Sequence, residues 1–102
     1  HGLYFSEPKL DFDIISEVRE KANIPVVMHG GSGVSDEDMK ECIRRGVRKI
    51  NYYTYAAKAA GAAVKEFCDN AEGLVLFHDV SVCAREALKA DIMAAMKVFQ
   101  CK

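Results

Sequence analysis

The sequence has almost no net charge and lacks the long apolar runs of a membrane protein. Fourteen lysines and arginines face fifteen aspartates and glutamates in 102 residues, a net charge of −1. So balanced a chain lacks the electrostatic field that favours binding to nucleic acid or to an anionic membrane surface. It has no apolar run of about 18 residues and no signal peptide. We therefore expect no nucleic-acid partner and no membrane partner.

The cysteines also lack informative spacing. Cys42, Cys68, Cys83 and Cys101 contain no C-x-x-C pair and no zinc-finger pattern. We interpret them as reduced thiols of a cytoplasmic protein that act as small apolar side chains. Half of the residues are hydrophobic, which is enough for the packed core of one domain.

The most informative segment that is present is IPVVMHGGSG, residues 24–33. A short run of strand-forming residues ends in His29, and a glycine-rich turn and a helix signal follow it. A second histidine–glycine pair, His1-Gly2, opens the chain about one strand–helix–strand unit earlier. Because neighbouring parallel strands end at the same rim, the two imidazoles would emerge close together. This pattern suits a metal whose remaining ligands come from elsewhere.

The hydrophobic pattern predicts that helices alternate with strands. The expected helices cover residues 11–22, a segment after Ser35, a segment from Thr54 or Tyr55 to about Asp69, and about Ser81 to Phe99; the expected strands cover 24–28 and 47–52. Ser35 and Asp38 form a capping-box pattern at the start of the second helix. Gly46 is expected to end that helix, just before the second strand. Residues 70–78 fit either a strand or a linker, and we favour the linker. The repeat fits part of a (β/α)8 barrel.

Two predicted turns at the strand ends would offer backbone N–H groups to an anion. The Gly30–Gly33 turn leads into one helix N-terminus, and Asn51 and Thr54 precede another. TIM barrels often hold phosphate between the loops of their last two strands. If these are the last two strands, both loops converge on one phosphate, and Ser32 could add a hydroxyl.

Each feature also has a purely structural interpretation, since strand-end histidines and glycine-rich turns often serve packing alone. We interpret His78 as a surface or capping residue. Tyr52, Tyr53 and Tyr55 are expected to be packing residues, although Tyr53 could also reach the pocket. The basic cluster Arg44, Arg45, Arg48 and Lys49 is expected to cover a helix C-terminus. The stripe on the last helix is expected to serve core packing or a subunit contact; it comprises Ala84, Leu88, Ile92, Met96 and Phe99.

Together, four segments resemble the class II, metal-dependent ketose-bisphosphate aldolases. They are HGLYFSEPKLDFDII (1–15), IPVVMHGGSGVSDEDM (24–39), GVRKINYYTYAA (46–57) and AREALK (84–89). The resemblance covers nearly the whole chain. It implies an α/β fold in which residues 1–102 are the C-terminal portion of a single TIM (β/α)8 barrel domain. That portion runs from the end of strand six through strand eight to the terminal helix.

The resemblance also implies a reaction: metal-dependent aldol cleavage or condensation of a ketose 1,6-bisphosphate, giving dihydroxyacetone phosphate and an aldehyde phosphate. It makes His1 and His29 two of three histidine ligands to a catalytic Zn²⁺ that stabilises the enediolate. It places Asn51 beside that enediolate as a catalytic residue. A monovalent cation, Na⁺ or K⁺, would lie near Gly2, Gly30 and Ser32. The implied phosphate-binding residues are Gly2, Gly30, Gly31, Ser32, Asn51 and Thr54; we add Tyr52 and Tyr53, because their backbone N–H groups lie in the same loop.

The chain opens inside a motif, and the third zinc ligand and the catalytic acid–base residues of the family lie upstream. We therefore expect a C-terminal piece that is active only with the upstream half of the barrel, within a homodimer or homotetramer. Tyr52 and Tyr53 depart from the small residues usual in the family, and the bulk of Tyr53 would narrow the site. Two alternatives stay open: an inactive sugar-phosphate-binding barrel, and an aldolase that acts on another phosphorylated ketose.

Overall fold

The computed structural model describes residue 6 and residues 8–101. This part of the chain forms, in order, α1 (Phe12–Ala22), β1 (Val26–Met28), α2 (Asp36–Arg45), β2 (Val47–Ile50), α3 (Thr54–Asn70) and α4 (Phe77–Phe99). The predicted alternation of helices and strands is confirmed. The expected end of a sixth strand at the start of the chain lies outside the described residues.

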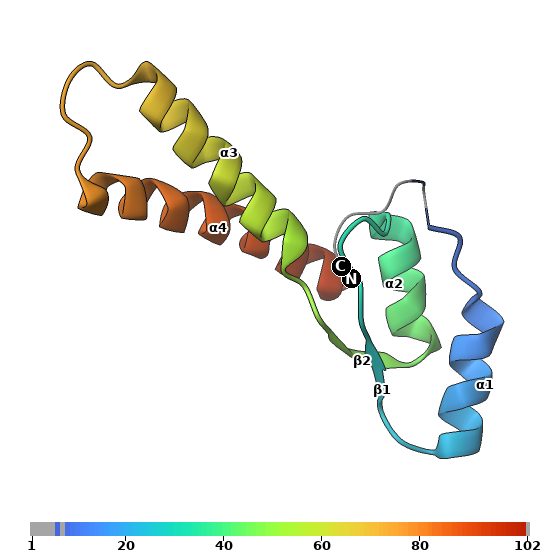
Figure 1. The fold of residues 1–102 in the computed structure, drawn as a ribbon. Coiled ribbons are helices and arrows are strands. Elements are labelled where there is room, and N and C mark those ends of the chain that lie inside the picture. The colour runs from blue at the N-terminus through green and yellow to red at the C-terminus, as the bar shows by residue number, and fades with distance from the viewer. Residues whose placement is uncertain (1–5, 7, 102) are drawn as a thin grey trace. The chain divides into compact units, whose positions relative to one another are not determined.

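The chain divides into two compact units. The first contains α1, β1, α2, β2 and the last residues from Met96, and the second contains residues 53–95. In the first unit, β1 and β2 are parallel neighbours connected through α2. Helix α1 packs on β1 and on α2, which itself packs on β2. Both helices lie on the same side of the strands (Figure 1), which is the arrangement of one sector of a barrel wall.

The pairing of β1 with β2 contains one extra residue. The register shifts between Val26 and Val27, so that Arg48 stands opposite no residue of β1, as in a β-bulge. The paired residues are Val26 with Val47, Val27 with Lys49, and Met28 with Ile50. Because side chains alternate along a strand, one extra residue moves all later side chains of β2 to the other face.

Local signals account for the bounds of the first two helices. Asp11 caps α1 by accepting hydrogen bonds from the N–H groups of Asp13 and Ile14 at 3.1 and 3.3 Å. Ser35 caps α2, and its Oγ accepts from the Asp38 N–H at 3.1 Å. Gly46 ends α2 with φ 129°, as the sequence predicts. Only this half of the expected capping box is present: among the described hydrogen bonds, the Ser35 N–H donates none to the Asp38 carboxylate.

In the second unit, α3 begins at Thr54, as predicted, and α4 begins at Phe77, four residues before the predicted start. The residues between them, 71–76, form a loop, so the linker interpretation is confirmed. His78 lies in the first turn of α4 with 72% of its side chain exposed, which confirms a surface position. No helix in the described part of the chain is both long enough and apolar enough to cross a membrane.

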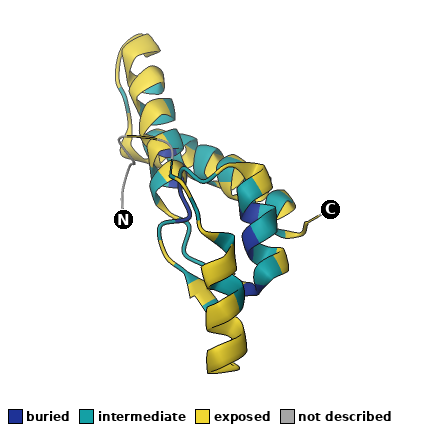
Figure 2. Cartoon of the chain, turned by 90° about the vertical axis from the view of Figure 1, so that its right-hand side faces the viewer, coloured by how far each residue is buried: buried dark blue, intermediate teal, exposed yellow. Residues whose placement is uncertain are grey.

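Little of this chain is buried, as Figure 2 shows by the small extent of dark blue. Helices α1 and α4 contain no buried residue, so the stripe on α4 builds no core within the described chain. Its alternative role as a contact with another segment or subunit stays a prediction. In the part of the chain that the structure describes, the buried apolar side chains are Met39, Cys42, Val47, Ala56 and Ala60. Large apolar side chains that are exposed include Ile14, Val27, Leu74, Phe77 and Met96.

Cys42 is the largest fully buried side chain among the described residues. Burial is the main cause that raises the pKa of its thiol, and the nearby carboxylates of Asp38 and Glu41 act in the same direction. All four cysteines are free, in agreement with the interpretation as reduced thiols.

Candidate functional site at the strand ends

His29 and Asn51 meet where β1 and β2 end. The Asn51 N–H donates to the Met28 carbonyl at 3.0 Å, which extends the strand pairing by one residue. The Asn51 side-chain nitrogen, Nδ2, lies 3.0 Å from His29 Nδ1 and 3.2 Å from Nε2. His29 is exposed and Asn51 is half-buried. The structure therefore brings together one of the predicted metal ligands and the predicted catalytic asparagine.

The extra residue in β2 is what turns Asn51 toward His29. Val47 is 2% exposed, and Ile50 lies close to Gly31 and so faces the α2 side of the strands. These two inward positions are three residues apart, whereas an unbroken strand repeats every two. The shift at Arg48 makes up the difference, so Lys49 and Asn51 share the opposite face with His29.

Lys49 is a neighbour of this pair that the sequence did not reveal. Its ammonium donates a hydrogen bond to Asn51 Oδ1. The sequence grouped Lys49 with residues that cover a helix C-terminus, which is correct for Arg48: its guanidinium donates to the carbonyls of Ile43 and Val47 at 2.8 and 2.9 Å. The signal in the sequence for this position of Lys49 is the three-residue spacing of the inward-facing Val47 and Ile50.

The remaining arginines of the basic cluster form ion pairs on α2. Arg44 and Arg45 both bind the Glu41 carboxylate, at 2.9 and 2.7 Å. The hydrogen bond from Arg45, followed by that from Arg44, lowers the pKa of Glu41 from its ordinary value. Arg45 also reaches Asp13 on α1 at 3.0 Å and so links the two helices.

The glycine-rich turn after His29 is packed more tightly than the sequence suggested. Gly30 and Gly33 have φ values of 69° and 94°, a region that favours glycine. Gly31 is buried, and a Cβ added there would lie 2.9 Å from Ile50 Cγ2. Ser32 is 4% exposed. Gly31 thus packs the turn on β2, and its implied contact with phosphate stays a prediction.

The positive end of the α2 dipole is already offset by groups of the chain itself. The Ser35 hydroxyl occupies one free N–H group, and the first turn carries the carboxylates of Asp36, Glu37 and Asp38. These groups complement the positive end of the helix dipole and repel a further anion. Any anion at this turn would be bound by N–H groups of the glycine segment more than by α2.

The start of α3, in the second unit, has the opposite character. Tyr53 holds the capping position without a side-chain hydrogen bond, and the first turn contains no acidic residue. The Tyr53 side chain is 75% exposed, so its interpretation as a packing residue is wrong within this chain. Tyr52, in the first unit, does pack: its ring meets that of Phe99 edge-on at a centroid distance of 6.0 Å.

The described residues can supply only part of a metal site. No group of three or more histidine, cysteine, aspartate or glutamate side chains gathers among them in a way that could hold a metal ion. His29 contributes one imidazole at a strand end, a ligand type that zinc accepts. His1 and Gly2 lie outside the described residues. The site therefore fits a single protein ligand of a zinc ion whose other ligands come from outside this region.

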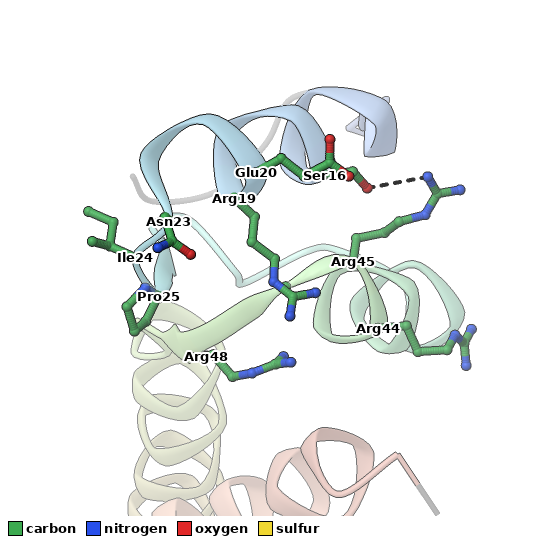
Figure 3. A pocket seen from close by; sticks show the side chains of 10 residues that line it. Ser16, Arg19, Glu20, Asn23, Ile24, Pro25, Arg44, Arg45 and Arg48 are labelled. Carbon is green, nitrogen blue, oxygen red and sulfur yellow. Dashed lines mark hydrogen bonds between the residues drawn. The ribbon is translucent and has the colours of Figure 1, made fainter.

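A pocket of about 600 Å³ lies at the other end of the strands, near Pro25 and Gly46. Figure 3 shows that arginine side chains dominate its lining. They are Arg19, Arg44, Arg45 and Arg48. Three of the four bond to carboxylates or helix carbonyls of the chain itself. None of the predicted site residues that the structure describes lines this pocket.

A parallel β-α-β unit with a histidine, a glycine-rich turn and an asparagine at the carboxyl ends of its strands is typical of the catalytic rim of α/β barrel enzymes. A model of one enzyme family, fructose-bisphosphate aldolase class-II, matches residues 1–102. The chain belongs to this family.

Two curated relatives and one solved structure define the similarity more closely. The chain is 39% identical to the uncharacterized protein YdjI of Escherichia coli K12, over 97% of its own length and 34% of the relative's. It is 32% identical to the 6-phospho-5-dehydro-2-deoxy-D-gluconate aldolase of Halalkalibacterium halodurans. That match covers 98% of this chain and 35% of the relative. It also matches the crystal structure of the E. coli YdjI aldolase with a TM-score of 0.82, over 96% of this chain and 35% of the other, at 39% identity. The chain thus spans about a third of the length of these relatives.

Proposed function

We propose that this chain is the C-terminal portion of a metal-dependent aldolase barrel, from the end of strand six through strand eight and the terminal helix. The observation that carries the proposal is the meeting of His29 and Asn51 at the carboxyl ends of β1 and β2, in a chain of the class II aldolase family. The match of this chain to about a third of the YdjI aldolase structure supports the same proposal.

The proposed reaction is the reversible aldol cleavage of a ketose 1,6-bisphosphate to dihydroxyacetone phosphate and an aldehyde phosphate. His29 and His1 would each give one imidazole to a zinc ion, and the third ligand would come from the upstream part of the barrel. When bound, the zinc would supply Lewis-acid polarisation of the substrate oxygens. Asn51 would direct its amide N–H groups at the substrate oxygen that gains negative charge.

The same proposal assigns the phosphate to backbone N–H groups at the strand ends. In the first unit these belong to Gly30, Gly31, Ser32, Asn51 and Tyr52, and in the second to Tyr53 and Thr54. The uncapped, acid-free start of α3 supports the second group. Gly2 and a monovalent cation, Na⁺ or K⁺, complete this part of the proposal.

The upstream half of the barrel is the proposed partner of this chain. The exposed apolar side chains, Val27 of β1 among them, are what such a half would cover. Assembly into a homodimer or homotetramer is a further expectation. The free thiols support a cytoplasmic location.

A second candidate function is aldol cleavage of a different phosphorylated sugar derivative. The relative from H. halodurans, named as a 6-phospho-5-dehydro-2-deoxy-D-gluconate aldolase, favours it, because the identity of 32% covers nearly the whole of this chain. The bulky Tyr53, two residues after Asn51 in the sequence, also argues against a standard substrate pocket. Both candidates use the same residues at the strand ends.

A cleavage assay of the complete protein, in which this chain follows its upstream portion, tests the proposal. We expect dihydroxyacetone phosphate or another small product from one member of a panel of phosphorylated ketoses, with loss of turnover after chelation. His29→Ala should abolish turnover and lower the bound zinc. His78→Ala, which alters an exposed histidine on α4, should change neither. Turnover and zinc content that survive His29→Ala would refute the assignment, and no cleavage of any phosphorylated ketose would favour an inactive binding barrel.

A further inference from the structure

Three side chains at the strand ends form a continuous set of polar contacts. The Lys49 ammonium donates to Asn51 Oδ1, and Nδ2 of the same amide lies 3.0 Å from His29 Nδ1. We propose that Lys49 is a positioning residue that orients the Asn51 amide, so that its N–H donors face His29 and the substrate oxygen. This inference rests on the function proposed above for His29 and Asn51.

The Asn51 amide needs such a partner because its two ends have almost the same shape. Packing alone scarcely distinguishes the oxygen from the nitrogen of an asparagine side chain. An ammonium has three donors and no acceptor, so Lys49 can bind only the oxygen end. With the oxygen held by Lys49, the nitrogen must face His29. A hydrogen bond from a charged donor is also about twice as strong as a neutral one.

The orientation decides what Asn51 can contribute to the reaction. Oriented N–H donors directed at a developing negative charge are among the largest contributions to catalysis. An amide turned by half a rotation would present its oxygen, which carries partial negative charge, to that same point. Lys49 would therefore act through Asn51, without contact to the substrate.

The exposed position of Lys49 argues against a purely structural role for its side chain. Its side chain is exposed, and the strand pairing of β2 uses backbone groups that a substitution leaves in place. Lys49→Met keeps the length of the apolar stem and removes the donor, whereas Lys49→Arg keeps a charged donor. Lys89→Met is a matched control, because Lys89 is an exposed lysine on α4.

The kinetic test uses the complete protein and its best phosphorylated ketose substrate. We expect Lys49→Met to lower kcat about tenfold, the cost of losing one oriented hydrogen bond, with KM changed less than about threefold. Lys49→Arg should recover most of the loss, and Lys89→Met should match the parent. In an Asn51→Ala background, Lys49→Met should have no further effect. An unchanged kcat in Lys49→Met, or an equal loss in the Asn51→Ala background, would overturn the proposal.

A spectroscopic test separates this inference from the proposed function. In ¹⁵N-labelled protein, the Asn51 side-chain amide protons should show nuclear Overhauser contacts to the His29 ring. These contacts should disappear in Lys49→Met and persist in Lys49→Arg. If the protein cleaves no phosphorylated ketose, the proposed function fails, but these spectra still report the amide orientation. Contacts that persist in Lys49→Met overturn the positioning role even in an active enzyme.

Discussion

The turns that follow β1 and β2 hold equivalent places in the repeat but are built in opposite ways. The turn before α2 is closed: Ser32 is buried, Ser35 caps the helix, and three acidic residues fill the first turn. The turn before α3 is open, because the helix start has neither a side-chain cap nor an acidic first turn, and Tyr53 is exposed.

This difference indicates how the two turns divide their roles. The first turn packs its small residues on β2 and balances the α2 dipole with carboxylates of the chain itself. The second leaves the positive end of the α3 dipole unbalanced, which favours an anion there. We therefore expect substitutions in the first turn to affect stability most, and substitutions in the second to affect phosphate binding most.

The largest expected effect is on folding, at Gly31. A Cβ at this position would lie 2.9 Å from Ile50 Cγ2 and 3.3 Å from Met39 Cε. Overpacking of this kind costs about 1–3 kcal/mol, so Gly31→Ala should lower the free energy of unfolding of the complete protein in urea by that amount. The control is Gly61→Ala within α3, where the new Cβ would meet no described atom within 4 Å other than its chain neighbours and its own helix backbone; it should stabilise by about 0.5–1 kcal/mol. Equal effects of the two substitutions would show that the first turn is not tightly packed.

The next largest effect is on phosphate binding, and it should differ between the starts of α2 and α3. Tyr53→Asp should weaken the binding of dihydroxyacetone phosphate about fivefold or more, because a carboxylate would offset the free dipole of α3. Tyr53→Asn, which adds a neutral capping side chain, is the matched control and should bind more tightly than Tyr53→Asp. Ser35→Ala should instead lower stability by about 1 kcal/mol and leave the affinity nearly unchanged. Titration calorimetry and thermal unfolding of the complete protein give both quantities. The comparison fails if Ser35→Ala weakens phosphate binding more than Tyr53→Asp does.

The smallest effect concerns pH and the ion pairs on α2. Hydrogen bonds from Arg45 and Arg44 hold the pKa of Glu41 below its ordinary value of 4.5. Since the pKa is lower in the folded protein, Glu41 contributes stability above about pH 4.5, and that contribution is lost as the pH falls through the folded-state pKa. Glu41→Gln should therefore lower the melting temperature slightly at neutral pH, with a difference from the parent that narrows below pH 4.5. A difference that stays constant down to pH 2 would contradict this linkage.

Features of the fold that depend on neighbours in sequence were predictable. Ser35 and Gly46 mark the ends of α2 by their capping chemistry, which the sequence alone is enough to indicate. His29 and Asn51 were expected at one rim because parallel strands end there, and their contact at 3.0 Å agrees with that expectation. The assignment of the segments to a known family rested on the same local motifs.

Features that depend on contacts between elements were not predictable. The extra residue at Arg48 shifts the strand register; the spacing of Val47 and Ile50 is its only trace within β2, and the pairing with β1 establishes it. The expected strand to residue 52 ends at Ile50, because the chain leaves the sheet to begin α3. The role of Lys49 follows from the shifted register, so a residue assigned to a helix end lies beside Asn51 instead. The steric limit at Gly31 likewise depends on Ile50, which is distant in sequence.

The most direct test of the account is a crystal structure of the complete protein with zinc and dihydroxyacetone phosphate. We predict anomalous density for zinc within bonding distance of His29, and the phosphate on backbone N–H groups of residues 30–32 and 51–54. Asn51 should direct Nδ2 toward the substrate oxygen with Lys49 on Oδ1. A zinc ion bound away from His29, or a phosphate held by neither turn, would contradict the account.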